Sequence, residues 1–347
     1  MTTPTTTASR ATRPRYPLLV VLACGAVLGV AVGLALTASA VVPGIAAPGT
    51  AVVVGLPLSR ALVDLAALTT VGLSFLPRFI GVDHARRATR ALDLTRRMAA
   101  VSAGVWLVGA LTSLMLETAA YNPGQPVTMT AIGQYVQAIP SGQALVVVAC
   151  CAFIYVVIAV LSIRRGEAIP VELRITVAMF ALLPLPVTGH AALDAAAWRD
   201  VTLISMELHV LSAVSWTGGL LAVLALLALR RDLLADALPR FSRLATVCVF
   251  ATAVTGAFNG WFELYATPGI HWYVALFTTG YGLILIGKLV CVAGAAALGG
   301  YTRFKLLPGI VARRPTAVLT WCTLEIAVLG IAFGLAAVLV RAPVVQT

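Results

Sequence analysis

Long apolar runs recur along this chain, and they constrain its fold more than any other feature. A run of 18 or more apolar residues is long enough to cross the hydrocarbon core of a bilayer as a helix. Helices and closed barrels are the only structures that satisfy every backbone hydrogen bond in lipid. Nine runs meet this condition, at roughly residues 17–40, 52–77, 97–118, 142–163, 170–190, 200–229, 243–264, 275–300 and 317–340. We therefore predict an all-α fold, a polytopic transmembrane bundle of about nine spans.

The composition agrees with a membrane protein and excludes an ordinary soluble domain. Of the 347 residues, 60% are hydrophobic and only 11% are charged, with a mean hydropathy of +0.99, whereas soluble proteins contain about 25% charged residues. The first apolar run follows Arg10, Arg13 and Arg15 and resembles a signal peptide. It is longer than an ordinary signal sequence, so we predict an uncleaved helix after a cytoplasmic tail of residues 1–16.

The basic residues predict the orientation in the membrane. Of the 24 Lys and Arg residues, 20 fall in alternate connections between the predicted spans: Arg10, Arg13, Arg15, Arg78, Arg86, Arg87, Arg90, Arg96, Arg97, Arg164, Arg165, Arg174, Arg230, Arg231, Arg240, Arg243, Arg303, Lys305, Arg313 and Arg314. Such connections face the cytoplasm, so we predict a multi-pass protein of the cytoplasmic membrane with a cytoplasmic N-terminus and an extracytoplasmic C-terminus. The formal charge of +11 is then a topology signal. Its partner is the anionic surface of the lipid bilayer, and we expect no nucleic acid binding.

Residues 206–219, MELHVLSAVSWTGG, place polar side chains inside an apolar run. Met206, His209 and Trp216 are spaced to lie along one stripe of a helix, whereas Glu207 points about 100° away from Met206. A thioether and an imidazole on one face form a soft ligand pair for Cu(I). The alternative is that His209 is a hydrogen-bonded packing residue, because polar side chains often link helices in membranes.

His190 is the second histidine of interest, at the end of the fifth run in LLPLPVTGH. Pro184 and Pro186 disturb the helix before it and free backbone carbonyls. The short connection to the next span puts His190 and His209 towards the same side of the membrane. We therefore predict a metal site that contains His190, His209 and Met206, with His190 at its access route.

Ionisable residues inside membrane spans are costly and mark functional sites by default. Lys288 lies near the middle of its span, and it needs a carboxylate, carbonyls or water. Glu325 and Glu207 are the candidate partners, so Lys288, Glu325 and Glu207 form a predicted intramembrane polar relay, with a purely structural ion pair as the alternative. Arg60 and Asp64 are four residues apart and are predicted to pair along one helix face.

Several segments together resemble the CopD family, the copper-resistance D membrane proteins. The resembling segments are PRFSRLATVCVFATAVTGAFNG, TTGYGLILIGKLVCVAGAAALGGYTRFKLLP and LEIAVLGIAFGLAAVL, with GHAA and HVLSAVSWTGGLL upstream. They run from about residue 190 to 341. The resemblance therefore divides the chain into N-terminal membrane helices at 17–190, about five spans, and a CopD-like membrane domain at 191–341, about four spans.

The resemblance implies copper handling across the cytoplasmic membrane, most often described as uptake, in copper homeostasis and resistance. The copper ion is the cargo, a periplasmic CopC-like copper-binding protein is the implied partner, and no enzyme activity is expected. His190 and His209 are the implied copper contacts, and Lys288 and Glu325 are family-pattern polar positions. Trp216, Gly218 and Gly219 are implied to be packing residues. Thr302 departs from the family pattern, since an asparagine is often found there.

Two other functions stay open from the sequence. A haem-binding membrane cytochrome is one, because His and Met are also axial haem ligands; only His209, with His190 at a helix end, is suitably placed. The other is a copper-delivery factor for respiratory oxidase assembly, acting with a separate CtaG-like protein. The sequence contains no nucleotide-binding motif, so a transporter of this kind would move copper by ligand exchange.

Overall fold

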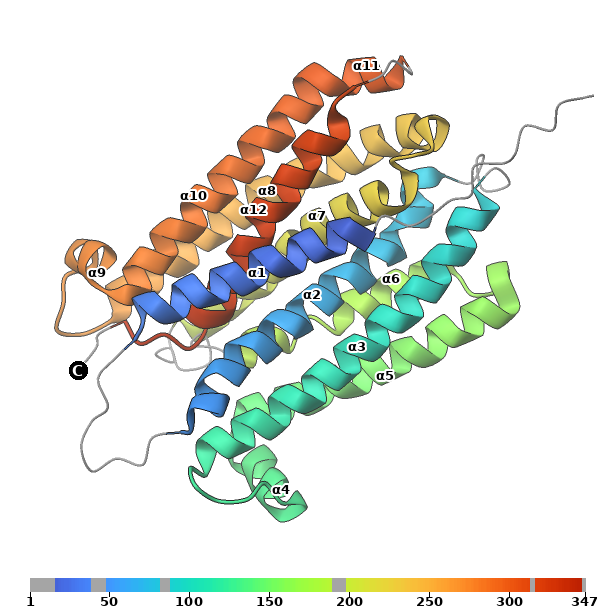
Figure 1. Cartoon of the computed structure of the whole chain (residues 1–347). Helices are drawn as coiled ribbons and strands as arrows, with labels where there is room; N and C mark the ends of the chain where they lie inside the picture. Colours follow the sequence, from blue (N-terminus) through green and yellow to red (C-terminus); the bar gives the residue numbers. More distant parts are fainter. Residues whose placement is uncertain (1–15, 39–47, 82–87, 189–197, 313–315, 345–347) are drawn as a thin grey trace, which may run out of the picture.

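The computed structural model describes residues 16–38, 48–81, 88–188, 198–312 and 316–344. Throughout these ranges the secondary structure is helical, without a strand (Figure 1). Eight long helices are apolar enough to cross a membrane: α1 (Tyr16–Leu36), α2 (Thr50–Ile80), α3 (Thr89–Tyr121), α5 (Pro140–Arg165), α7 (Arg199–Leu227), α8 (Arg231–Ala266), α10 (Gly280–Tyr301) and α12 (Val318–Leu339). Shorter helices are α4 (Met129–Ala138), α6 (Val171–Phe180), α9 (Trp272–Thr278) and α11 (Leu307–Val311). The all-α polytopic bundle is confirmed.

The predicted fifth span at 170–190 is wrong as a continuous helix. Its first part is α6, which ends at Phe180, and a turn then leads to the 3-10 helix η3 (Leu185–Thr188). Pro184 and Pro186 explain the break, because proline lacks a backbone N–H and clashes with the preceding turn of a helix. Such irregular backbone is tolerated at membrane depth when protein covers it, and Leu182 and Leu185 are both buried.

The broken segment nevertheless runs along much of the length of the bundle. At its start, Glu172 pairs with Arg78 near the end of α2. At its end, Leu185 lines a cavity together with Arg60, which lies about 27 Å from Arg78 along α2 at 1.5 Å per residue. The described part of the chain therefore has eight long helices and one discontinuous segment between α5 and α7.

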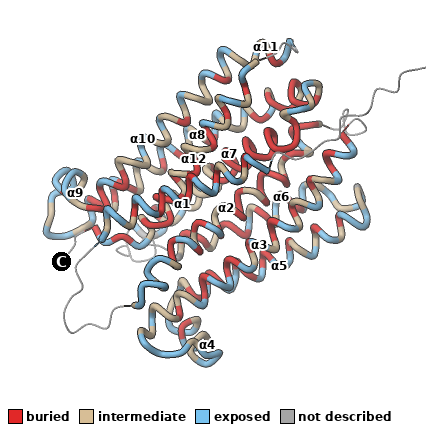
Figure 2. The backbone as a smooth tube through the Cα atoms, in the orientation of Figure 1, coloured by how far each residue is buried: buried red, intermediate tan, exposed pale blue. Residues whose placement is uncertain are grey.

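Helix α7 lies at the centre of the bundle. It packs against α2 on one side and α8 on the other, and 83% of its apolar window is buried, compared with 22% for α8 and for α10. Figure 2 shows this concentration of buried residues on α7. Helices α2, α3 and α5 pack in sequence on one side, and α12 packs between α1 and α10 on the other. The part of α7 from Val214 to Leu227 is therefore surrounded by protein, whereas Ile204 and Leu208 nearer its start are exposed.

Glycines permit the closest helix contacts. A Cβ atom on Gly72 of α2 would lie 1.9 Å from the backbone oxygen of Gly218 on α7, so both positions exclude larger residues. On the other side of the bundle, a Cβ on Gly29 of α1 would lie 2.3 Å from the backbone oxygen of Ile331 on α12. Small residues commonly let membrane helices approach in this way.

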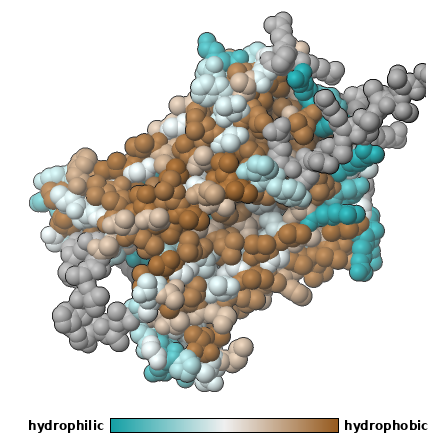
Figure 3. All heavy atoms as spheres, in the orientation of Figure 1, coloured by the Kyte–Doolittle hydropathy of each residue, from teal (hydrophilic) through white to brown (hydrophobic). Residues whose placement is uncertain are grey.

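The two ends of the bundle differ in charge. Figure 3 shows a hydrophobic band between them, with the most hydrophilic residues gathered at the end where α2 and α5 finish. We call this the basic end, because it carries Arg78, Arg164, Arg230 and Arg303. Arg240 closes part of it by donating to the backbone oxygens of Phe79 and Ile80 at 2.8 and 2.7 Å. Helices α4 and α9 lie at the opposite end (Figure 1).

Candidate functional site

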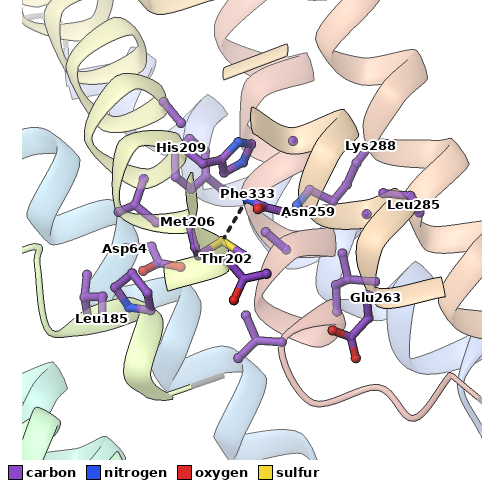
Figure 4. Close-up of a pocket in the computed structure, with 18 of the residues that line it drawn as sticks. Asp64, Leu185, Thr202, Met206, His209, Asn259, Glu263, Leu285, Lys288 and Phe333 are labelled. Carbon is purple, nitrogen blue, oxygen red and sulfur yellow. Dashed lines mark hydrogen bonds between the residues drawn. The ribbon is translucent and has the colours of Figure 1, made fainter. Parts of the chain in front are cut away.

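A cavity of about 160 Å³ lies inside the half of the bundle away from the basic end. It is enclosed by α2, η3, α7, α8, α10 and α12, and its polar lining includes Arg60, Asp64, Met206, His209, Asn259 and Lys288 (Figure 4). We call it the His209 cavity. A space of this size holds several water molecules, so it can receive an ion with part of its hydration shell.

The structure brings two residues of the α7 stripe into this cavity. Met206 and His209 both line it and lie on neighbouring turns of α7, with their side chains turned inward in Figure 4. Glu207 does not line the cavity, as its angle around the helix predicts. The thioether and the imidazole therefore share one polar space, whereas the carboxylate next to them in sequence does not.

Contacts from α8 fix the tautomer of His209. Its Nδ1 lies 3.1 Å from the backbone oxygen of Thr252 and 3.2 Å from Oγ1 of Thr255. A carbonyl oxygen only accepts hydrogen bonds, so Nδ1 carries a proton, and in the neutral ring Nε2 then carries the lone pair. The ring fits because α8 has Gly256 at this point, where a Cβ would lie 2.8 Å from Cε1 of His209. His209 thus offers an oriented neutral imidazole, which is the form that binds metals.

Asn259 is a polar residue of the cavity that the sequence reasoning missed. Its Nδ2 donates to Sδ of Met206 at 3.8 Å, which fixes the thioether in place. Its Oδ1 is buried and has no hydrogen-bond partner among the described residues. A buried orphan acceptor usually faces a water or an ion. An amide inside the apolar run GAFNGW was the signal that could have pointed to it.

The charged residues of the cavity differ from the predicted relay. Arg60 and Asp64 pair at 3.2 Å as expected from their spacing, with side chains only 15% and 13% exposed. Lys288 points towards Asn259 in Figure 4, and the acids that line the same cavity are Asp64 and Glu263. The expected partners, Glu325 and Glu207, do not line this cavity. Helix spacing reveals neighbours only within one helix, so the sequence paired Asp64 with Arg60 and did not indicate that Asp64 and Lys288 share a cavity.

Glu325 lies instead in a second cavity, nearer the basic end. This Glu325 cavity has a volume of about 330 Å³ and is formed by α7, α8, α10, α12 and the π-helical turn η5 (Thr302–Leu306). Trp216 and Glu325 both line it. Lys288 is separated from Gly299, which faces Glu325, by eleven residues of α10, or about 16 Å. Lys288 and Glu325 are therefore not direct partners, and the α7 stripe connects two separate cavities.

His190 lies outside the described residues. The chain that leads to it passes the site, because Leu185 and Pro186 line the His209 cavity. Within the described ranges, no group of three or more His, Cys, Asp and Glu side chains is placed to hold a metal ion. Among the described residues that line the cavity, the nitrogen and sulfur ligands suited to a soft monovalent ion such as Cu(I) are the imidazole of His209 and the thioether of Met206.

Comparison with protein families gives two matches along the chain. A family model described as "Copper resistance protein D-like, N-terminal domain" matches residues 49–201. A second, described as "Copper resistance protein D", matches residues 235–339. No curated protein and no solved structure matches. The two matched segments together cover most of the chain and flank most of α7.

Proposed function

The chain belongs to the copper resistance protein D family, and from this premise we propose that it transports copper, in the direction of uptake, across the cytoplasmic membrane. Family membership supports a role in copper resistance and handling in general. The observation that carries the transport proposal is the pairing of a metal-ready imidazole with a thioether in one polar cavity. That cavity lies among long apolar helices of the bundle.

The donor set favours Cu(I) as the transported species. His209 offers Nε2 and Met206 offers Sδ, and soft thioether sulfur selects against hard cations. His190 is proposed as the residue that receives copper at the mouth of the cavity, because the segment that precedes it lines the site. A periplasmic CopC-like protein is the proposed donor. In this arrangement the basic end faces the cytoplasm, following the positive-inside rule.

The positive charge of Lys288 suits a site that releases its ion better than a site that stores it. The formal charges of the described ionisable side chains that line the His209 cavity, Arg60, Asp64, Glu263 and Lys288, sum to zero when His209 is neutral. The net charge of the cavity therefore adds no electrostatic attraction for a cation beyond its bonds to His209 and Met206. A transport site must bind its ion firmly enough to admit it and weakly enough to release it. Lys288 is proposed to keep copper exchangeable.

The size of the cavity argues against the haem alternative. Sites for drug-sized ligands measure roughly 300–1,000 Å³, whereas the His209 cavity measures about 160 Å³. Haem is at least as large as such ligands. Absence of a Soret band from the purified protein would be the expected result.

Transport by purified protein in sealed liposomes tests the proposal. Wild-type protein is expected to carry Cu(I) inward well above empty liposomes, and His209→Ala is expected to lower the rate to near the background. Glu207→Gln is the matched control, because it alters the adjacent face of the same helix without touching the cavity. Wild-type liposomes that take up no more copper than empty ones would overturn transport. In cells, a fall in oxidase copper at constant cytoplasmic copper would indicate delivery to an oxidase instead.

A further inference from the structure

We propose that Glu325 is a proton-binding site whose occupancy is linked to copper binding in the His209 cavity. This inference rests on the proposed function, because the linkage requires copper at His209. The carboxyl group of Glu325 carries a proton while the His209 cavity is empty and loses it more readily when a copper ion arrives. Three observations support this: a buried acid without an ion pair among the described residues, a cavity that leads from it to the basic end, and helices shared with the copper site.

The buried acid is the first observation. Glu325 is only 3% exposed and is the one charged residue in the sequence of α12. It forms no ion pair with the described residues. An ionised carboxylate is costly in such surroundings unless an opposite charge lies beside it, and a bound proton removes that cost. The protonated form is therefore the form that this position favours.

Few charged or titratable groups surround this acid. Arg303 of η5 lines the same cavity, but its Nη1 donates to the backbone oxygen and Oγ of Ser242 at 2.9 and 3.1 Å and to Oγ1 of Thr246. The described charged residues of α2, α7, α8 and α10 do not line the cavity, and α1, which packs against α12, has none. Cys322, one turn before Glu325, is a neutral thiol at ordinary pH. A proton is therefore the simplest means of neutralising the carboxylate.

The Glu325 cavity gives a proton a route to water. It has a volume of about 330 Å³, which holds several water molecules. Its lining extends from Glu325 to Thr246 and Phe304, which are exposed, and to Arg303 at the basic end. The lack of a side chain on Gly299 keeps space beside the acid, because a Cβ there would lie 3.1 Å from Oε1. Water in this space can carry protons between the carboxyl group and the solution.

The π-helical turn η5 forms one wall of this route. Thr302 and Arg303 of η5 line the cavity together with Ser242 and Thr246 of α8, so hydrogen-bonding groups are present to hold water. Turns of this kind are rare and occur frequently at functional sites. Here η5 interrupts the regular hydrogen bonding that α10 would otherwise continue. The irregular backbone thus lies between the buried acid and the basic end.

The copper site and Glu325 are close enough to influence each other. Helices α7, α8, α10 and α12 line both cavities. The cavities are separated by about 10 Å along α7, from His209 to Trp216, and by about 16 Å along α10, from Lys288 to Gly299. At an effective dielectric constant of about 20, a positive ion at this distance makes loss of the proton about 5- to 15-fold more favourable. The linkage is reciprocal, so loss of the proton raises the affinity for copper by the same factor.

Proton release on copper binding tests the linkage. Purified full-length protein in weak buffer, without oxygen, receives Cu(I) stabilised by acetonitrile, and a pH indicator records the protons released. Above the ordinary histidine pKa of about 6.5, neutral His209 has no proton to lose at Nε2. A 5- to 15-fold linkage releases at most about 0.4–0.6 proton per copper ion. Glu325→Gln is expected to lose this amount, and Glu207→Gln, outside both cavities, is expected to keep it. Protons from other groups, such as Lys288, are released by both proteins and cancel in the difference.

Infrared difference spectroscopy supplies a second readout that needs no change at Glu325. A protonated carboxyl group has a C=O stretching band that the ionised form lacks. In wild type this band is expected to weaken when the pH rises and, at constant pH, when Cu(I) binds. A folded Glu325→Gln protein is expected to lack both changes. The wild-type measurement keeps the inference testable if Glu325→Gln fails to fold.

The outcomes separate the two proposals. Equal proton release by wild type and by a folded, copper-binding Glu325→Gln protein overturns the linkage and leaves the copper site standing. A carboxyl band that neither pH nor copper changes does the same, and it is the result expected of an acid that keeps its proton permanently. Failure of wild type to bind any Cu(I) overturns the copper site and the linkage together. A pH-dependent band that Glu325→Gln lacks would in that case still support the proton site.

Discussion

A single methyl group on α8 would test whether His209 is oriented for metal binding. Gly256→Ala places a Cβ 2.8 Å from Cε1 and 3.2 Å from Nδ1 of His209. Carbon atoms in contact lie about 3.5–4.0 Å apart, so the ring must move by about 0.7 Å or more. Its bonds of 3.1 and 3.2 Å to Thr252 and Thr255 already stand at the upper limit of about 3.2 Å. They would break.

Loss of these orienting bonds sets the expected magnitude. Removing a group that orients a metal-bound histidine weakens metal binding by about 10- to 100-fold. Gly256→Ala is therefore expected to lower the affinity for Cu(I) by this factor while His209 itself is retained. The free energy of unfolding is expected to fall by at most about 2.5 kcal/mol, because replacing a helical glycine gains about 0.5–1 kcal/mol and crowding the site costs about 1–3 kcal/mol.

The control is Gly260→Ala, one turn further along the same helix and in the same cavity. Its Cβ would lie 2.7 Å from Cδ1 of Leu285, which is the end of a flexible side chain that can turn aside. Competition with a Cu(I) chelator measures both variants. Wild-type affinity in Gly256→Ala, or an equal loss in Gly260→Ala, would refute the orienting role of the α8 contacts.

Two further predictions concern stability. Arg240→Met removes the two bonds to the carbonyls of Phe79 and Ile80; the expected loss is about 1–2 kcal/mol, since Arg240 is exposed and bonds to charged groups contribute about 1.5–3 kcal/mol. Thermal unfolding in detergent measures it, with the exposed Arg243→Met as a control that should not change. Burial raises the pKa of Tyr135 on α4 to about 12 from the ordinary value of 10. The unfolded chain therefore ionises first, and the stability contributed by the neutral phenol is full below pH 10 and declines as the pH rises to 12. Tyr135→Phe should abolish this decline, and tyrosinate absorbance at 295 nm that titrates fully near pH 10 in folded wild type would contradict it.

The length of the apolar runs predicted most of the helices but not their ends. Helix α8 begins at Arg231 and α3 at Thr89, well before the predicted 243 and 97. Hydropathy identifies the part of a helix that lies in hydrocarbon, whereas hydrogen bonding continues the helix into polar surroundings. The prediction of a continuous fifth helix at 170–190 was wrong for another reason. The apolar run is long enough to cross a membrane, but Pro184 and Pro186 interrupt the helix.

The sequence predicted only the part of the candidate site that lies on a single helix. The spacing of Met206 and His209 indicated a shared face, and both residues line one cavity. The groups that orient them, Thr252 and Asn259, come from α8. No local pattern shows which faces of two helices meet, so these residues were missed. The roles of His190, His209 and Met206 as metal ligands stay predictions.

The contact between α1 and α12 has a consequence for biosynthesis. Gly29 meets Ile331, about 300 residues later in the chain, so at roughly 5–20 residues per second α1 waits roughly 15–60 s before its partner exists. During that interval its glycine face lies against lipid or another helix. A nascent chain that stops before α12 would leave α1 without its main packing partner. Truncation near the C-terminus would therefore expose the glycine face of the first helix.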